Sequence, residues 1–493
     1  MAPSIGETFL ATAARYPDKP AIIDGETALT YREYAGAALS VAAALGARNA
    51  PERVALLMPT SAPFAIAFFG IILSGRTPVP LNFFLAGEEL AFIVADCGAR
   101  LVIASRFFEK QAEGIGAEAV LAEDFLPEAL KSAPAKAAAA NHFAVIPYTS
   151  GTTGRPKGVL LSHGNILANV FACAEHFNFT SEHVILGMLP FFHTFALTTT
   201  LVVPAAVGAT AVLLPRFEGS AAIRAVTRHK VTAIMAVPSM YRALARTLER
   251  ADADMSRVRL PISGGEPLPE EVFETYQSRF GVTIYEGYGM TETSPVIAGN
   301  TPGASRPLTV GRPLPGVEVR VVNDQGQDAG VNADGEIWVR GESVMEGYLN
   351  LPDETESAIT GNAFFRTGDI GRFDPDGFLK ITGRKKEMMI SAGENIFPRE
   401  IEIVLARHEA VAEAAVIGIP DDVRGEAPKA FVVVKPGKNA TADELKEFCR
   451  QHIARFKVPS EIEFRDEFPH GPTGKILKQR LVPSYREASG GDR

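Results

Sequence analysis

In the first half of the chain, short apolar runs alternate with longer segments of helical character. The runs 53–58, 77–81 and 100–104 are apolar after their first residue and are typical of buried strands. Segments 30–46 and 61–74 are predicted helices: the first begins with a capping box and ends near a glycine, and a glycine follows the second. This alternation predicts a parallel sheet with helices on its faces.

The pattern changes after Thr309. Segments 317–322 and 336–340 alternate apolar and polar residues with a period of two, which favours half-buried antiparallel sheet. Segments 413–419 and 429–434 are further predicted strands in the last hundred residues. The predicted fold class is therefore α/β: a large N-terminal domain of layered β-sheets and helices with a β-rich subdomain near its end, and a small α+β C-terminal domain.

Composition narrows the class of protein. At 493 residues the chain is too long for a single core, and its net charge of −9 argues against nucleic acid as a partner. Three separated cysteines, Cys97, Cys173 and Cys449, form no disulfide or zinc pattern and suit a reducing compartment. The N-terminus has no signal-peptide pattern, and the apolar runs 64–74 and 196–214 are expected to be buried rather than transmembrane. We therefore predict a cytoplasmic protein without a transmembrane segment.

The segment Tyr148–Gly158 carries glycines, hydroxyls and a lysine between a predicted strand and a predicted helix. Such residues suit a phosphate, because glycine allows close backbone approach and hydroxyls donate hydrogen bonds. A solvated turn is the alternative interpretation. The segment is not a Walker loop, because Gly158 rather than Ser or Thr follows Lys157. The residues that we expect at the phosphates are Thr149, Ser150, Gly151, Thr152, Thr153, Gly154 and Lys157.

All eleven positions of this segment resemble the signature of the adenylate-forming enzymes: acyl-CoA synthetases, luciferases and the adenylation domains of peptide synthetases. Further motifs follow in the family's order out to Lys475, so that the resemblance spans nearly the whole chain. It is nearest to the fatty acid–CoA ligases. This resemblance implies ATP, Mg²⁺ and CoA as the small molecules that the protein uses.

The resemblance also implies a nucleotide site. The Gly264–Pro267 turn would lie along the adenine, Tyr288 would stack near it, and Asp369 and Arg384 would hold the ribose. Glu292 would bind Mg²⁺, for which a carboxylate is a suitable ligand, although outside this motif a solvated charge is the more common role. The remaining nucleotide contacts expected here are Gly265, Glu266, Pro267, Gly287 and Thr291.

His193 stands among aromatic residues, where a histidine is more often part of a core. The resemblance instead places it against the acid substrate, with Val237, Gly264, Gly287 and Gly289. For an amino-acid adenylation domain the resemblance implies an aspartate in this region to hold the ammonium of the substrate, but none occurs between Pro190 and Leu201, and an unpaired buried amine is costly. The sequence therefore favours a simple carboxylic acid over an amino acid.

The remaining implied roles lie near the C-terminus. The resemblance predicts an N-terminal domain over 1–383, with its β-rich subdomain at about 309–383. A hinge follows at 384–387, pivoting at Lys386, and a mobile C-terminal domain covers 388–493. Ser391, Gly393 and Glu394 would line the CoA channel. The predicted catalytic residues are Lys475, Thr291, Glu292, Lys157 and His193.

These features predict an ATP-dependent acid–CoA ligase that forms an acyl-AMP intermediate and releases AMP and pyrophosphate, with a medium- or long-chain fatty acid as substrate. The alternatives are an aryl acid–CoA ligase, an acyl-AMP ligase that loads a carrier protein, and, from a different class, an inactive nucleotide-binding scaffold. A peptide-synthetase adenylation domain is disfavoured by the missing aspartate. The expected partners are small molecules, and the oligomeric state stays open, a homodimer included.

Overall fold

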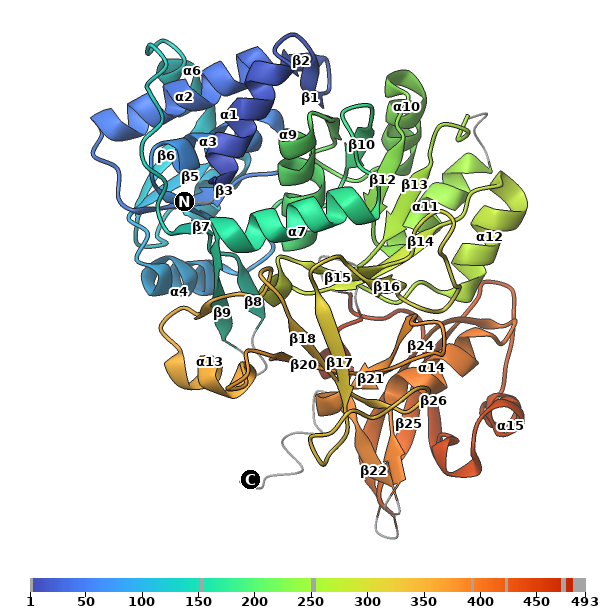
Figure 1. Cartoon of the computed structure of the whole chain (residues 1–493). Coiled ribbons are helices and arrows are strands. Elements are labelled where there is room, and N and C mark those ends of the chain that lie inside the picture. The colour runs from blue at the N-terminus through green and yellow to red at the C-terminus, as the bar shows by residue number, and fades with distance from the viewer. Residues whose placement is uncertain are drawn as a thin grey trace. The chain divides into compact units, whose positions relative to one another are not determined.

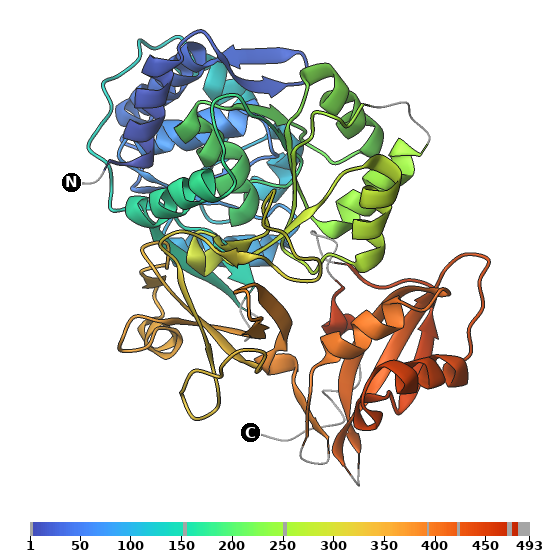
Figure 2. The same cartoon turned by 45° about the vertical axis from the view of Figure 1, so that its right-hand side comes forward.

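The computed structural model describes residues 3–150, 155–249, 254–391, 394–421, 424–470 and 476–481. The chain forms two compact units. The first consists of Met1–Leu268, Val272–Val319 and Val339–Phe365, and the second of Pro269–Glu271, Arg320–Trp338 and Arg366–Arg493. Helices and strands alternate along the first unit (Figures 1 and 2), so the predicted α/β class is confirmed.

A nine-stranded sheet is the centre of the first unit. Its six middle strands are parallel, and the strands beyond them at the two ends are joined to their neighbours by antiparallel pairing. Ile22 of the first strand pairs with Ala211, far along the chain. In spatial order the strands are β16 (Arg312–Pro313), β15 (Val296–Gly299), β14 (Tyr285–Gly289), β13 (Leu260–Ser263), β12 (Ala233–Ala236), β10 (Val184–Gly187), β11 (Thr210–Leu213), β1 (Pro20–Asp24) and β2 (Thr27–Thr30).

Both faces of this sheet are covered, because successive strand residues point to opposite sides. Ile185 belongs to one hydrophobic cluster and its neighbour Leu186 to another. Figure 1 shows the helices that supply the two clusters on either side of the strands. One cluster includes α7 (His163–His176) and α9 (Val203–Val207); the other includes α10 (Gly219–His229), α11 (Pro238–Leu248) and α12 (Glu270–Phe280).

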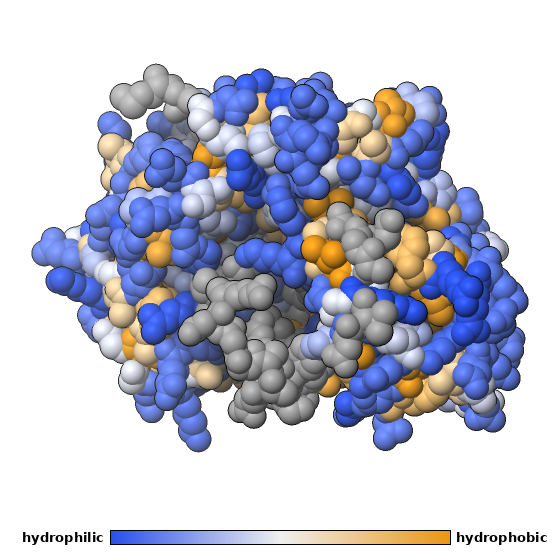
Figure 3. Space-filling model, turned by 90° about the horizontal axis from the view of Figure 1, so that it is seen from below, coloured by the Kyte–Doolittle hydropathy of each residue, from blue (hydrophilic) through white to orange (hydrophobic). Residues whose placement is uncertain are grey.

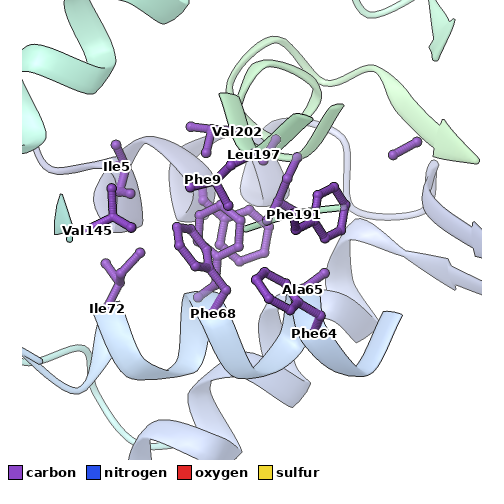
Figure 4. Close-up of a cluster of buried hydrophobic side chains, with 14 of the residues drawn as sticks. Ile5, Phe9, Phe64, Ala65, Phe68, Ile72, Val145, Phe191, Leu197 and Val202 are labelled. Atoms are coloured by element: carbon purple, nitrogen blue, oxygen red, sulfur yellow. The ribbon is translucent and has the colours of Figure 1, made fainter. Parts of the chain in front are cut away.

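Helix α3 (Ala62–Leu73) is buried along its whole length except at Pro63. Its apolar residues face all round, which is the pattern of a helix enclosed by protein. Figure 4 shows Phe64, Phe68 and Ile72 of this helix facing Ile5 and neighbouring core residues. The predicted helix at 61–74 is thereby confirmed as a buried element. The neighbouring helices are α1 (Ile5–Arg15), α2 (Tyr31–Ala47) and α6 (Ala122–Ala129).

Two smaller sheets complete the first unit. A parallel sheet has the order β4 (Thr77–Pro80), β3 (Arg53–Leu57), β5 (Leu101–Ala104) and β6 (Glu118–Leu121), with α4 (Gly87–Cys97) and α5 (Glu109–Ala112) nearby in sequence. The other has the order β19 (Gly347–Tyr348), β9 (Pro156–Ser162) and β7 (Phe143–Val145), and β8 (Tyr148–Ser150) also pairs with β9. Helix α13 (Pro352–Ala358) follows β19.

The predicted β-rich segment forms a four-stranded sheet, β17 (Glu318–Val322), β18 (Gly335–Arg340), β20 (Phe365–Phe373) and β21 (Leu379–Arg384), and the division between the two units runs through it. Beyond residue 384, the described part of the second unit contains a five-stranded sheet and two α-helices. Its elements are β22 (Met389–Ser391), β23 (Glu394–Ile396), α14 (Pro398–Ala406), β24 (Val411–Asp421), β25 (Gly425–Val434), α15 (Ala442–His452) and β26 (Glu461–Arg465).

Among the described residues, no helix combines the length and the apolar character that a membrane crossing requires. Figure 3 shows one face of the molecule, which is mostly hydrophilic with scattered hydrophobic residues. The apolar runs 64–74 and 196–214 contribute buried helices and the buried strand β11 instead.

Candidate active site

The described ends of the glycine- and hydroxyl-rich segment, 148–150 and 156–158, are strand residues and belong to the two strands of a hairpin. Strands β8 and β9 pair antiparallel, with Thr149 opposite Lys157 and Ser150 opposite Pro156. The helix predicted after the segment, with Ser162 as its cap, is confirmed: α7 begins at His163, and the Ser162 side chain accepts a hydrogen bond from Asn165 N. The predicted phosphate contacts Gly151, Thr152, Thr153 and Gly154 lie outside the described residues.

The base of this hairpin is held by Tyr148. Its hydroxyl donates to Asp96 Oδ2 at 2.6 Å, and Asn350 Nδ2 donates to the other carboxylate oxygen of Asp96 at 3.1 Å. A Cβ atom at Gly158 would lie 3.0 Å from the Tyr148 ring. The glycine after Lys157 is therefore explained by close packing against this tyrosine.

Lys157 and Glu292, two predicted catalytic residues, lie close together in the first unit. Lys157 forms an ion pair with Glu354, and its ammonium lies 5.3 Å from the centre of the Tyr348 ring. The Tyr348 hydroxyl donates to Glu292 Oε1 at 2.9 Å. Glu292 is 7% exposed, so its carboxylate is mostly removed from water. One tyrosine thus contacts both residues.

The His193 segment approaches the same motif. Thr194 Oγ1 donates to Thr291 Oγ1 at 3.0 Å, which joins the residue after His193 to the residue before Glu292. Phe191 and Leu197 on either side are buried in the core, as Figure 4 shows. His193 thus projects from a segment that is fixed at both ends.

Within the described part of the chain, His193 Nε2 is buried without a hydrogen-bond partner. Burial lowers the pKa of His193 to about 4, so that the imidazole is neutral at pH 7. The Phe192 ring lies beside it, with ring centres 4.4 Å apart. A neutral imidazole among aromatic rings can donate or accept a hydrogen bond, and it adds no charge that would attract a second carboxylate.

The other predicted acid contacts meet at the carboxyl ends of parallel strands β12, β13 and β14, where ligands bind in sheets of this kind. Gly264 N donates to Ala236 O at 3.2 Å, and a Cβ atom at Gly264 would lie 3.3 Å from the Phe195 ring and 3.8 Å from Gly287 O. Val237 follows β12 and lies near Gly265, whose φ is +84°. The structure therefore brings Val237, Gly264, Gly265 and Gly287 together, and Glu266, Pro267 and Tyr288 belong to the same two strand ends.

Gly289 has a different structural reason to be small. A Cβ atom there would lie 2.1 Å from Pro295 O, within the pairing of β14 with β15. Close approach of two backbones accounts for this glycine. Its contact with the acid stays a prediction.

In the second unit, Asp369 and Arg384 are opposite each other in the antiparallel pair β20–β21. Arg384 Nε lies 2.9 Å from Asp369 Oδ1; the Asp369 side chain is 5% exposed and that of Arg384 54%. A buried carboxylate fixed by a partly exposed guanidinium is an arrangement that can present oxygen and N–H groups to a pair of hydroxyls. The two residues predicted to hold the ribose are therefore neighbours.

The remaining predicted positions are also in the second unit. Lys386 lies in a short 3₁₀ turn, Lys385–Glu387, directly after β21. Ser391 is buried and pairs with Glu394 across the β22–β23 hairpin. Gly393 and Lys475 lie outside the described residues.

Sequence reasoning missed three residues that contact the predicted site: Tyr348, Glu354 and Thr194. Tyr348 and Glu354 lie more than fifty residues from the motifs that they contact, in the two-residue strand β19 and the short helix α13. Thr194 directly follows His193, but nothing in the sequence indicated its hydrogen bond to Thr291. A search for hydroxyl side chains beside the predicted catalytic residues could have singled it out.

Acid should destabilise the protein between about pH 6.5 and pH 4, and His193 should contribute to that loss. In this range an unfolded histidine binds a proton, whereas folded His193 does not. Lowering the pH therefore favours the unfolded state, and the free energy of unfolding decreases as the pH decreases. His163, whose pKa burial also lowers to about 4, acts in the same direction. His193→Phe should reduce the difference in unfolding free energy between pH 7 and pH 4.5 by about 1–3 kcal/mol, measured by urea titration. An unchanged difference would contradict this account of His193.

Comparison with known proteins identifies the family. Residues 9–349 match the AMP-binding enzyme family, and residues 400–475 match the AMP-binding enzyme C-terminal domain. A long-chain-fatty-acid–CoA ligase of Bacillus subtilis (strain 168) is 33% identical, over 97% of this chain and 93% of that protein. Hence the chain belongs to the AMP-binding enzyme family.

Solved structures agree with this assignment. The anthranilate CoA ligase AuaEII in complex with anthranoyl-AMP has a TM-score of 0.91 and 28% identity, covering 99% of this chain and 98% of that one. The o-succinylbenzoate CoA synthetase of Bacillus subtilis in complex with ATP and magnesium has a TM-score of 0.87 and 32% identity, covering 96% and 98%. Within its family, the chain is an AMP-forming acid–CoA ligase.

Proposed function

We propose that this ligase activates medium- or long-chain fatty acids with ATP and Mg²⁺ and transfers the acyl group to CoA. The observation that carries the choice of acid is the burial of His193 beside the Phe192 ring, and the other predicted acid contacts, Val237, Gly264, Gly287 and Gly289, are all uncharged as well. The fatty-acid ligase among the relatives supports the same choice.

In the first half-reaction, a carboxylate oxygen attacks the α-phosphorus of ATP, and the bond from that phosphorus to the bridging oxygen breaks to release pyrophosphate. A carboxylate is a poor electrophile, and adenylation provides AMP as a leaving group. In the second half-reaction, the CoA thiolate attacks the acyl carbon, and the carbon–oxygen bond to AMP breaks. Because negative charge accumulates on the phosphates, catalysis should rest mainly on positioning and electrostatics.

The residues assigned to the phosphates suit that chemistry. Lys157 would contribute positive charge beside the β8–β9 hairpin, and the hydroxyl of Thr291 would donate to a phosphate oxygen. Lys475 would add a second cation from the C-terminal domain. Asp369 and Arg384 would hold the ribose through both half-reactions, because AMP stays bound until the thioester has formed.

The site also fits Mg²⁺. Among the described residues there is no group of three or more His, Cys, Asp or Glu side chains that could hold a metal on its own. Mg²⁺ bound to a nucleotide needs only one or two protein carboxylates, because water and phosphate oxygens complete its octahedron. The buried Glu292 would supply such a carboxylate, and the bound ion would neutralise phosphate charge.

An aryl acid is the second candidate, because the anthranilate ligase has a very similar fold. The Phe192 ring beside His193 could stack on an aryl group as well as pack against an alkyl chain. The absence of a cationic side chain at the predicted acid contacts argues against a dicarboxylate in either case.

The catalytic efficiency kcat/KM should rise with the chain length of a saturated acid until the pocket is full. Each buried methylene contributes about 0.8 kcal/mol, which corresponds to roughly four-fold in kcat/KM. The measurement is AMP release with CoA for even-numbered acids from C4 to C18, with aryl acids alongside. Dicarboxylates of equal carbon number are the matched control and should be poor substrates. If an aryl acid, a short dicarboxylate or an amino acid is the best substrate, the proposed acid class is wrong.

A further inference from the structure

We propose that Tyr348 is a positioning residue that fixes Glu292 and Lys157 relative to each other, so that the metal ligand and the phosphate-binding cation act as one preorganised unit. The proposal rests on the function proposed above. Tyr348 belongs to neither of the two motifs that it connects, and all four side chains of the cluster, Tyr348, Glu292, Lys157 and Glu354, lie in the first unit.

The backbone places Tyr348 between the two motifs. Strand β19 pairs antiparallel with β9, and Tyr348 is opposite Val159. Leu349 N donates to Gly158 O at 2.8 Å, beside Lys157. On the other side, Met345 N donates to Glu292 O at 2.8 Å. The five-residue stretch 345–349 is therefore hydrogen-bonded to the backbone of both motifs.

The side chain contacts each motif through a different group. The hydroxyl donates to Glu292 Oε1 at 2.9 Å, and the ring faces the Lys157 ammonium at 5.3 Å, within the range of a cation–π contact. The hydroxyl therefore directs one oxygen of the Glu292 carboxylate.

Tyr348 is itself fixed by the start of α13. Its backbone N donates to Thr355 Oγ1 at 2.9 Å, and a Cβ atom at Gly347, whose φ is +154°, would lie 2.8 Å from the Thr355 side chain. The same helix carries Glu354, the ion-pair partner of Lys157. An ammonium has three donors, so Lys157 can exchange Glu354 for a phosphate oxygen while it stays over the ring.

The test separates the hydroxyl from the ring. Tyr348→Phe removes only the hydrogen bond to Glu292, and the Mg²⁺ concentration for half-maximal acid-dependent pyrophosphate exchange should rise roughly ten-fold, as expected for the loss of a hydrogen bond to a charged group. The KM for the acid should change less than two-fold. Tyr348→Leu also removes the ring and should raise the KM for ATP as well.

Tyr276→Phe is the matched control. The Tyr276 hydroxyl donates to Tyr241 O at 2.9 Å inside the core of α11 and α12, so this change removes a buried tyrosine hydrogen bond away from the site. Its Mg²⁺ dependence should equal that of the unaltered protein. If both Tyr→Phe variants shift the Mg²⁺ dependence equally, or Tyr348→Phe shifts nothing, Tyr348 has no positioning role.

A second measurement does not depend on turnover. In calorimetry, Tyr348→Phe should weaken binding of Mg²⁺–ATP but not of ATP in EDTA, and in a Glu292→Gln background it should have no further effect on Mg²⁺–ATP binding. Additive losses in the double variant would overturn the coupling. A protein that shows this binding pattern but activates no acid in the panel would instead refute the proposed function and leave the role of Tyr348 intact.

Discussion

Lys475→Ala should slow acyl-adenylate formation by about 100-fold or more and leave conversion of supplied acyl-AMP and CoA to the thioester near its normal rate. Loss of a preorganised cation that is aimed at the reacting phosphate typically slows the reaction by at least this factor. Lys475 belongs, by the predicted domain division, to the same domain as the predicted thiol-channel residues 391–395. One fixed placement of that domain would have to bring both Lys475 to the phosphates and residues 391–395 to the thiol channel. We expect instead that the domain turns about Lys386 between the two half-reactions. Pyrophosphate release and thioester formation, measured separately, distinguish the two steps.

Two further variants sharpen this experiment. Lys386→Pro should spare adenylation and slow thioester formation, because fixing φ at the pivot hinders the turn. Lys438, whose exposed side chain pairs only loosely with Glu409 at 3.4 Å, is the matched control, and Lys438→Ala should leave both rates unchanged. Equal impairment of both half-reactions by Lys475→Ala would show that this lysine is not specific to adenylation.

Asp369→Ala should weaken ATP binding and slow both half-reactions, because the ribose has to be held in each. Losing a charged hydrogen-bond partner should cost about 1.5–3 kcal/mol, or roughly ten- to 150-fold in kcat/KM for ATP. The burial of Asp369 and its 2.9 Å contact with Arg384 favour the upper part of this range. ATP dependence of pyrophosphate exchange measures the first step, and the rate with preformed acyl-AMP measures the second.

Asp328→Ala is the control for Asp369. Asp328 forms an ion pair with Arg320 of β17 at 2.8 Å, but its side chain is 66% exposed, and exposed pairs contribute little to stability. Its loss should leave ATP kinetics unchanged. Normal kinetics in Asp369→Ala itself would remove the ribose assignment, because a buried acid at that position would then have only a structural role.

The pattern of apolar and polar residues was sufficient to predict those helices and strands whose burial follows a regular pattern along the element. Helix α3 is apolar on every side and begins at a serine cap, so its position and its burial could both be predicted. Segments 317–322 and 336–340 alternate cleanly and form strands of the four-stranded sheet, and the family resemblance placed Asp369 and Arg384 where the register of β20 and β21 makes them partners.

The β8–β9 hairpin and the Tyr348 cluster could not be predicted in the same way. The glycines and Pro156 in 148–158 hide the pairing of β8 with β9, because glycine and proline are depleted in strands. Tyr348 reaches Glu292 and Lys157 only because β19 pairs with β9, and no local pattern specifies a two-residue strand. Contacts between distant segments depend on tertiary register, which single residues do not encode.

The pairing of β1 with β11 affects the order in which the protein can be assembled during synthesis. Ile22 leaves the ribosome long before its strand partner Ala211, so β1 cannot enter the parallel core of the sheet until β11 has been made. Helix α3 belongs to the same hydrophobic cluster as Leu197 and Val202, which are also synthesised much later than the helix. Its apolar surface therefore stays uncovered until those residues have been made. Such long-range pairing slows folding and leaves apolar surface open to wrong partners meanwhile. The first two hundred residues should therefore depend on chaperone protection more than the C-terminal sheet, whose longest strands, β24 and β25, form a hairpin from neighbouring residues.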